Sequence, residues 1–140
     1  MPYYRNYTKP SVFEKLTAAL SYIFPLIGFV FIIAAALMKK DLKPFLKYHI
    51  FQSIFIAFAL WLILTGLTYL FNLLSYIPVL KNIIGMITFF LNTPIILGFS
   101  IVTFIYCMFI LYLILGVIRG SDSYVPWVSD IIKTNLKGQI

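Results

Sequence analysis

The charged residues of this chain bound three long uncharged stretches, which run from Leu16 to Met38, from Tyr48 to Leu80 and from Asn82 to Ile118. An α-helix rises about 1.5 Å per residue and the hydrocarbon core of a bilayer is about 30 Å thick, so about 20 apolar residues are enough to cross it. No stretch alternates between apolar and polar residues as the strands of a membrane barrel do. The pattern predicts an all-α, polytopic membrane helical bundle, with three to four transmembrane helices and additional amphipathic interfacial helices.

The first stretch predicts a transmembrane helix over about residues 16–38. Ser11 and Glu14 have the spacing of a capping box, in which each side chain satisfies a free amide at a helix start, so a helix should begin directly after Ser11. Pro25 removes a backbone hydrogen bond and predicts a kink or break just before it. Two lysines follow the long apolar run and no small-residue cleavage site is visible, so we interpret this segment as a retained anchor rather than a signal peptide.

The second stretch predicts a span over about residues 48–73, preceded by Pro44, which suits the first turn of a helix. The third stretch is too long for one crossing and slightly short for two. Pro94 disfavours a helical conformation in the residue before it and fits the first turn of a helix. We therefore expect the third span over about residues 94–118.

Two shorter segments have amphipathic patterns. Residues 79–91 place polar side chains on one helical face and Ile and Leu side chains on the other, which predicts a short amphipathic or re-entrant helix. Residues 126–137 show a similar pattern, with Trp127 at the start, and predict an interfacial C-terminal helix. The chain is interpreted as a single membrane domain over residues 1–140.

The basic residues predict an orientation. With three crossings, the connection around Lys43 shares a side with the C-terminal tail, and together these segments hold seven of the 11 Lys and Arg residues. The positive-inside rule then places Lys43 and the tail in the cytoplasm and the N-terminus on the other side. A fourth crossing, through Ile83 to Leu91, would move the tail to the opposite side.

Composition supports a membrane location and changes the choice of partner. Hydrophobic residues make up 62% of the chain and charged residues 11%, against about 25% in soluble domains. The net charge of +7 would suggest nucleic acid for a soluble protein, but here the basic residues flank apolar spans. We therefore expect the lipid bilayer as a partner, together with other membrane proteins or a homo-oligomer, and no nucleic acid.

The sequence offers little material for enzyme chemistry. His49 is the only histidine, and the acids fall at or beyond the predicted membrane edges, at Glu14, Asp41, Asp122 and Asp130. No pair of carboxylates, metal-ligand spacing, Ser-His-acid arrangement or glycine-rich phosphate loop is visible. We expect no enzymatic activity, no cofactor and no metal. The single cysteine, Cys107, lies in an apolar stretch and is interpreted as a buried structural thiol.

Polar and small side chains at helical spacing give two kinds of candidate site. The polar patch at the start of the second span is either a structural hydrogen-bond cluster or a partner or substrate contact, formed by Lys43, Lys47, His49, Gln52 and Ser53. Small residues predict helix-packing seams at Ser21, Pro25 and Gly28 and at Thr93, Ser100 and Thr103. The second of these stripes could instead line a hydrophilic path.

Four motifs carry a resemblance to a known family, and they are LSYIFPLIG at Leu20 to Gly28, KPFLKYHIFQS at Lys43 to Ser53, LNTP at Leu91 to Pro94 and GSDSYVPWVSD at Gly120 to Asp130. In order and spacing they resemble the family of the twenty-kilodalton subunit of the chloroplast inner-envelope protein-import translocon and its bacterial relatives. The plastid members have four spans, usually carry Asn at the position of His49, and contain an extra segment between the first two motifs. The chain is therefore more similar to the bacterial relatives.

The resemblance implies a translocon-type subunit that acts without catalysis in protein transport or in the assembly of a membrane complex. It also implies a location in a bacterial plasma membrane or a plastid-type inner membrane. Composition and spacing alone do not suggest protein transport. The alternative function is that of a small-solute channel, a transporter subunit or a membrane-organising protein.

Overall fold

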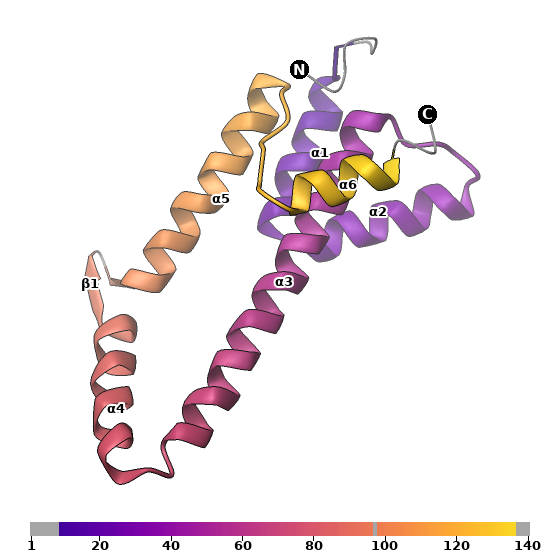
Figure 1. Cartoon of the computed structure of the whole chain (residues 1–140). Coiled ribbons are helices and arrows are strands. Elements are labelled where there is room, and N and C mark those ends of the chain that lie inside the picture. Colours follow the sequence, from indigo (N-terminus) through magenta and orange to yellow (C-terminus); the bar gives the residue numbers. More distant parts are fainter. Residues whose placement is uncertain (1–8, 97, 137–140) are drawn as a thin grey trace. The chain divides into compact units, whose positions relative to one another are not determined.

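The computed structural model describes residues 9–96 and 98–136. The protein is mainly helical, with 78% of its residues in helices. Within the described residues there are six helices and one two-stranded hairpin (Figure 1). Their bounds are α1 Val12–Ile23, α2 Pro25–Leu37, α3 Pro44–Leu74, α4 Pro78–Asn92, β1 Pro94–Ile96, β2 Phe99–Ser100, α5 Ile101–Arg119 and α6 Val128–Leu136.

The first apolar stretch forms two helices rather than one continuous span. The capping box predicted before α1 is confirmed, since Ser11 N donates to Glu14 Oε2 at 3.0 Å and Glu14 N donates to Ser11 Oγ at 3.3 Å. Phe24 lies between α1 and α2, and Pro25 occupies the first turn of α2. At 12 and 13 residues, α1 and α2 are each only about 20 Å long, so the prediction of one uninterrupted transmembrane helix over residues 16–38 is wrong.

The chain returns after α2 to the place where α1 begins. Lys43 Nζ, in the connection before α3, lies 2.7 Å from Glu14 Oε1 in the first turn of α1. Lys15 Nζ donates to the carbonyl oxygen of Ile118, at the end of α5, over 2.8 Å. The prediction that the N-terminal segment and Lys43 lie on opposite sides of a membrane is therefore wrong for the described residues, because the start of α1, the start of α3 and the end of α5 meet.

Two helices are long and apolar enough to cross a membrane. They are α3, with 31 residues, and α5, with 19 residues. Few of their side chains are buried within the chain, unlike those of a core helix in a soluble protein. At about 1.5 Å per residue, α3 is about 46 Å long and exceeds the thickness of the hydrocarbon core.

The third predicted span begins seven residues later than the sequence suggested. Pro94 does not open a helix; it lies in β1, which pairs with β2 in an antiparallel hairpin that brings Pro94 opposite Ser100. Gly98, with φ of 82°, lies in the turn, where a residue without Cβ adopts this conformation at no steric cost. The helix α5 then starts at Ile101, and Ser100 Oγ accepts from Thr103 N at 3.2 Å, as an N-terminal cap does.

The chain divides into two compact units. Unit 1 comprises Met1–Phe58 and Ile110–Ile140, and unit 2 comprises Ala59–Phe109. Among the described residues, every buried side chain belongs to unit 1, and none of those between 59 and 109 is buried. The core of the protein therefore lies where α1, the start of α3, the end of α5 and α6 come together.

Candidate functional site

A buried polar network occupies the centre of unit 1. Tyr22 comes from α1, Tyr48, His49 and Gln52 come from the first turns of α3, Ser123 from the loop after α5, and Ser129 from α6; we call this set the polar network. All of these residues are at most 3% exposed. Burying so many polar groups is favourable only when they bond to one another, and they do.

Gln52 is the centre of the polar network. Its Nε2 donates to the carbonyl oxygen of Ser123 at 2.8 Å and to Ser129 Oγ at 3.3 Å, and its Oε1 accepts from the Tyr22 hydroxyl at 2.6 Å. Tyr48 also donates to Ser129 Oγ, at 2.9 Å. One amide side chain thus joins α1 and α3 to the C-terminal segment.

The protons of the polar network follow from one fixed acceptor. A carbonyl oxygen only accepts, so the group of Gln52 that faces Ser123 is the amide nitrogen, and Oε1 therefore faces Tyr22. The single hydroxyl proton of Tyr22 then goes to Gln52. His49 Nδ1, 2.9 Å from the Tyr22 oxygen, must donate. We assign His49 as the Nδ1–H tautomer from this network.

His49 is enclosed by aromatic rings on the side away from these bonds. Its ring centroid lies 4.5 Å from that of Phe45 and 5.2 Å from that of Tyr48, both in steep edge-on arrangements. Its second nitrogen, Nε2, is buried and has no hydrogen-bond partner among the described residues. His49 therefore serves the polar network through one nitrogen only.

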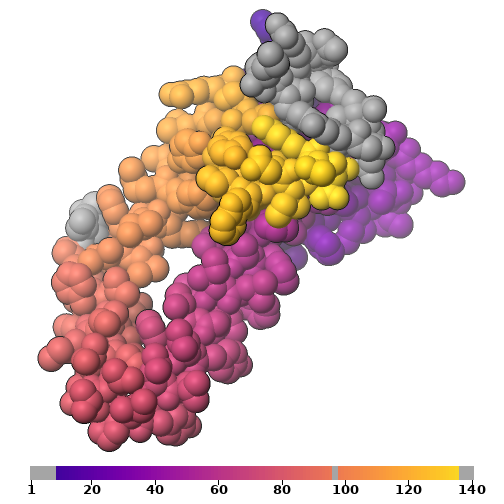
Figure 2. Space-filling model, in the orientation of Figure 1, coloured from indigo at the N-terminus to yellow at the C-terminus, as the bar shows by residue number. Residues whose placement is uncertain are grey.

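The C-terminal segment is fastened to unit 1 by serines. Ser129 Oγ accepts from Val125 N at 2.8 Å, and Ser123 Oγ donates to the carbonyl oxygen of Leu113 at 3.0 Å. A Cβ atom at Gly116 would collide with Ser123 Oγ, so only glycine allows the loop to lie this close to α5. The face of α6 that includes Val128, Ser129 and Ile132 is buried, and its surface lies in front of the start of α3 (Figure 2).

Two carboxylates at the edge of unit 1 have different surroundings. Burial acts to raise the pKa of Glu14, but hydrogen bonds from Lys43 and Ser11 outweigh it and leave the pKa below its ordinary value. Asp122 is the opposite case. Both of its carboxylate oxygens are buried without a hydrogen bond, and Lys133 Nζ lies 3.8 Å away. Burial therefore raises the pKa of Asp122 to about 6, although Lys133 opposes the shift.

The predicted partner-contact residues are separated by the structure into two groups. His49, Gln52 and Ser53 are buried in the chain's own core, and Ser53 donates to the carbonyl oxygen of Ile50 at 2.8 Å. They are not presented to a partner molecule. Lys43 is half-exposed while it pairs with Glu14, and Lys47 is partly exposed.

The predicted packing seams have unequal outcomes. Gly28 and Ser21 are buried together, and a Cβ atom at Gly28 would lie 2.9 Å from Ile50 Cγ2 and 3.0 Å from Ser21 Oγ. Pro25 is partly exposed and starts α2. The stripe predicted on the third span is wrong, because its members lie on three different elements, with Thr93 after α4, Ser100 in β2 and Thr103 in α5. The prediction of a buried thiol is also wrong, since Cys107 is exposed.

Sequence reasoning missed four members of the polar network, namely Tyr22, Tyr48, Ser123 and Ser129. The bond from Gln52 to Ser123 joins residues 71 positions apart, and the bond from Tyr48 to Ser129 joins residues 81 positions apart. Periodicity detects neighbours on one helix and not partners this distant. The available signal was that each of the four residues lies within one of the motifs quoted above.

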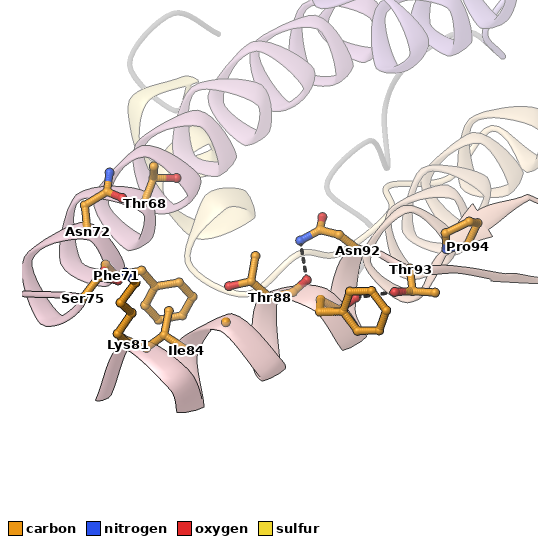
Figure 3. Close-up of a pocket in the computed structure, with 12 residues that line it drawn as sticks. Thr68, Phe71, Asn72, Ser75, Lys81, Ile84, Thr88, Asn92, Thr93 and Pro94 are labelled. Carbon is orange, nitrogen blue, oxygen red and sulfur yellow. Dashed lines mark hydrogen bonds between the residues drawn. The ribbon is translucent and has the colours of Figure 1, made fainter. Parts of the chain in front are cut away.

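Unit 2 contains a cavity of about 760 Å³ between the last turns of α3 and the helix α4 (Figure 3). Its polar lining includes Asn72, Lys81, Thr88 and Asn92. Among the described residues no group of three or more His, Cys, Asp or Glu side chains is placed to hold a metal ion. Comparison with protein-family models, with curated proteins and with solved structures found no match.

Proposed function

We propose that this chain is a non-enzymatic integral membrane protein that works as a subunit of a membrane complex, in protein transport or in the assembly of that complex. The observation that carries the proposal is the absence of any buried side chain among the described residues between 59 and 109. Exposed side chains such as Leu62, Phe90 and Ile105 are large and apolar. Lipid or another membrane protein has to cover them.

In this proposal α3 and α5 cross the bilayer and the rest of the chain does not. All Lys and Arg residues except Lys81 then precede Tyr48 or follow Ile118. This is a much stronger asymmetry than a three-span arrangement gives, and the positive-inside rule places both ends of the chain in the cytoplasm. The pairing of Glu14 with Lys43 supports the same arrangement, because it brings α1 back to the start of α3.

The extension to protein transport rests on the resemblance alone. Three of its four motifs supply the polar network, through Tyr22, through Tyr48, His49 and Gln52, and through Ser123 and Ser129. In this proposal the motifs preserve a rigid cytoplasmic scaffold. The apolar surface of unit 2 is then the part that partners contact within the membrane.

A conducting pore in a single copy is less well supported. Between Ser53 and Thr65, α3 carries no hydroxyl, amide or charged side chain. A path for ions or polar solutes needs polar groups along its length. The cavity of unit 2 lies beyond this apolar segment of α3, so its polar lining does not continue along the helix.

Photocrosslinking in native membranes tests the subunit role. A photoreactive residue at Leu62 or Ile105, which are 49% and 63% exposed, is expected to capture the same membrane protein, and one at Ile56, which is 6% exposed on the same helix as Leu62, is expected to capture none. If Leu62 and Ile105 capture only lipid, the subunit role is wrong. Solute flux through liposomes that contain only this protein would instead favour a channel.

A further inference from the structure

The cavity of unit 2 is lined by a polar face from each of two helices. Thr68, Asn72 and Ser75 follow one another at steps of four and three in the last turns of α3. On α4, Lys81, Thr88 and Asn92 share a face at steps of seven and four. Both faces line the same space (Figure 3), so an otherwise apolar unit holds its polar side chains in one place.

Several of these polar groups are already engaged with their own helix. The hydroxyls of Thr68 and Ser75 donate to the carbonyl oxygens of Leu64 and Phe71 at 2.8 and 2.7 Å. They retain only acceptor capacity toward the cavity. The donors that remain for a ligand are the Lys81 ammonium, the Asn72 amide and the Thr88 hydroxyl, for which no intramolecular hydrogen bond is found within the described residues.

Lys81 gives the cavity a net positive charge. It is the only charged residue between positions 59 and 109, so unit 2 contains no carboxylate that could neutralise it. An ammonium group on an apolar unit needs water or an anion. The cavity thus combines one uncompensated cation with neutral donors and acceptors, which suits an anionic group that also carries hydroxyls.

The position of the cavity along α3 indicates where its ligand comes from. Thr68 lies 20 residues after Tyr48 in one unbroken helix, which is about 30 Å or the thickness of the hydrocarbon core. The cavity is therefore at the level of lipid head groups when α3 crosses a bilayer. Its remaining wall includes Phe71, Ile84 and Phe89, which are apolar and suit the start of an acyl chain.

From this geometry we propose that the cavity of unit 2 binds the head group of an anionic phospholipid, with Lys81 paired to the phosphate, Asn72 and Thr88 as further donors, and the acyl chains against the apolar wall. The occupant is a lipid and not a soluble anion, because one cation in a wide cavity holds a free phosphate weakly and the apolar wall contributes nothing to it. The site is separate from the polar network and does not depend on the identity of a protein partner.

Crosslinking with a photoactivatable phosphatidylglycerol in liposomes tests the proposal. Wild-type protein in an equimolar mixture with phosphatidylcholine is expected to give crosslinks to α4 and to the last turns of α3. Lys81→Gln removes the charged donor and is expected to lower these crosslinks about tenfold. Lys40→Gln, which removes an exposed lysine from unit 1, is expected to leave them unchanged.

A second variant tests the cavity without changing charge. A Cβ atom at Gly85, which lines the cavity, or at Gly66, which does not, meets no atom within 4 Å. Gly85→Leu is therefore expected to fill the site and reduce crosslinking, while Gly66→Leu is the matched control with full crosslinking. Equal crosslinking of wild type and Lys81→Gln, or equal crosslinking by photoactivatable phosphatidylcholine, overturns the proposal. Loss of the crosslinks on addition of inorganic phosphate shows a soluble-anion site and overturns the lipid assignment.

Discussion

Tyr22, Gln52 and Ser129 of unit 1 are buried and bond to residues far away in the sequence, whereas Thr68, Ser75 and Thr93 of unit 2 bond to the backbone four residues earlier in their own helix. The first kind of bond fixes how segments meet, and the second satisfies a hydroxyl without joining anything. Unit 1 therefore specifies its own tertiary structure through polar contacts. Unit 2 satisfies its polar groups locally and leaves its outer surface to the surroundings.

The glycines show the same contrast. A Cβ atom at Gly28 or Gly116 would meet atoms of another segment at less than normal contact distance, so both positions require glycine for packing. At Gly66 and Gly85 a Cβ atom has no neighbour within 4 Å. Substitutions in unit 1 should therefore change the stability of the protein, and substitutions in unit 2 should change what the protein binds.

The largest expected difference between the two regions is their accessibility from the two sides of the membrane. In a Cys107→Ser background, Tyr76→Cys, in the turn between α3 and α4, is expected to react fully with an impermeant maleimide added outside intact cells. Lys9→Cys and Lys40→Cys are expected to react only after permeabilisation, because the start of α1 and the connection before α3 lie together. Labelling of Lys9→Cys but not of Lys40→Cys in intact cells would contradict the two-span arrangement.

A matched pair of substitutions on α3 should separate the two regions by stability. Gln52→Leu leaves the Tyr22 hydroxyl and the Ser123 carbonyl without their partner, and each buried group left so costs about 1 to 3 kcal/mol. Asn72→Leu replaces an exposed amide in unit 2 and should be nearly neutral. The measurement is the midpoint of thermal unfolding in detergent, and equal midpoints would show that the polar network does not hold unit 1 together.

Local signals in the sequence predicted local structure. Ser11 with Glu14 gave the start of α1, and Pro25 gave the break that ends it, because caps and prolines act within a few residues. The same signals say nothing about the direction that the chain takes after a break. The return of α2 toward Lys43, which overturned the three-span orientation, depends on an ion pair between distant residues and has no local signature.

Pro94 shows how a local rule can select the wrong element. Proline fits the first turn of a helix and also fits a short edge strand, and the sequence before it favoured a boundary in either case. Gly98 decides between them, since its positive φ forms the turn of a hairpin that delays α5 to Ile101. The polar network, in contrast, was half visible: His49 and Gln52 were selected as a cluster, but their partners on α1 and α6 could not be paired with them by spacing.

The smallest predicted effect concerns Asp122 and the pH dependence of stability in unit 1. Its pKa is raised from 3.8 to about 6 in the folded protein by burial, so between these pH values the folded state holds a proton that the unfolded state has released. Stability should therefore fall as pH rises from about 4 to 6 and then stay level. Asp122→Asn cannot lose a proton, and it is expected to melt at a higher temperature than wild type above pH 6, with the difference disappearing toward pH 4.

Glu14 provides the control, because its shift has the opposite sign. Its pKa lies below the ordinary value of 4.5, so its contribution to stability is present above that pH and is lost as the pH falls through the folded-state pKa. Glu14→Gln should thus lower the melting temperature near neutral pH and converge with wild type in acid, whereas Asp122→Asn should raise it near neutral pH. Unit 2 contains no carboxylate, so Asn72→Leu should leave the pH profile unchanged. If Asp122→Asn instead melts below wild type at pH 7, the 3.8 Å pairing with Lys133 outweighs the burial of the carboxylate, and the assigned direction is wrong.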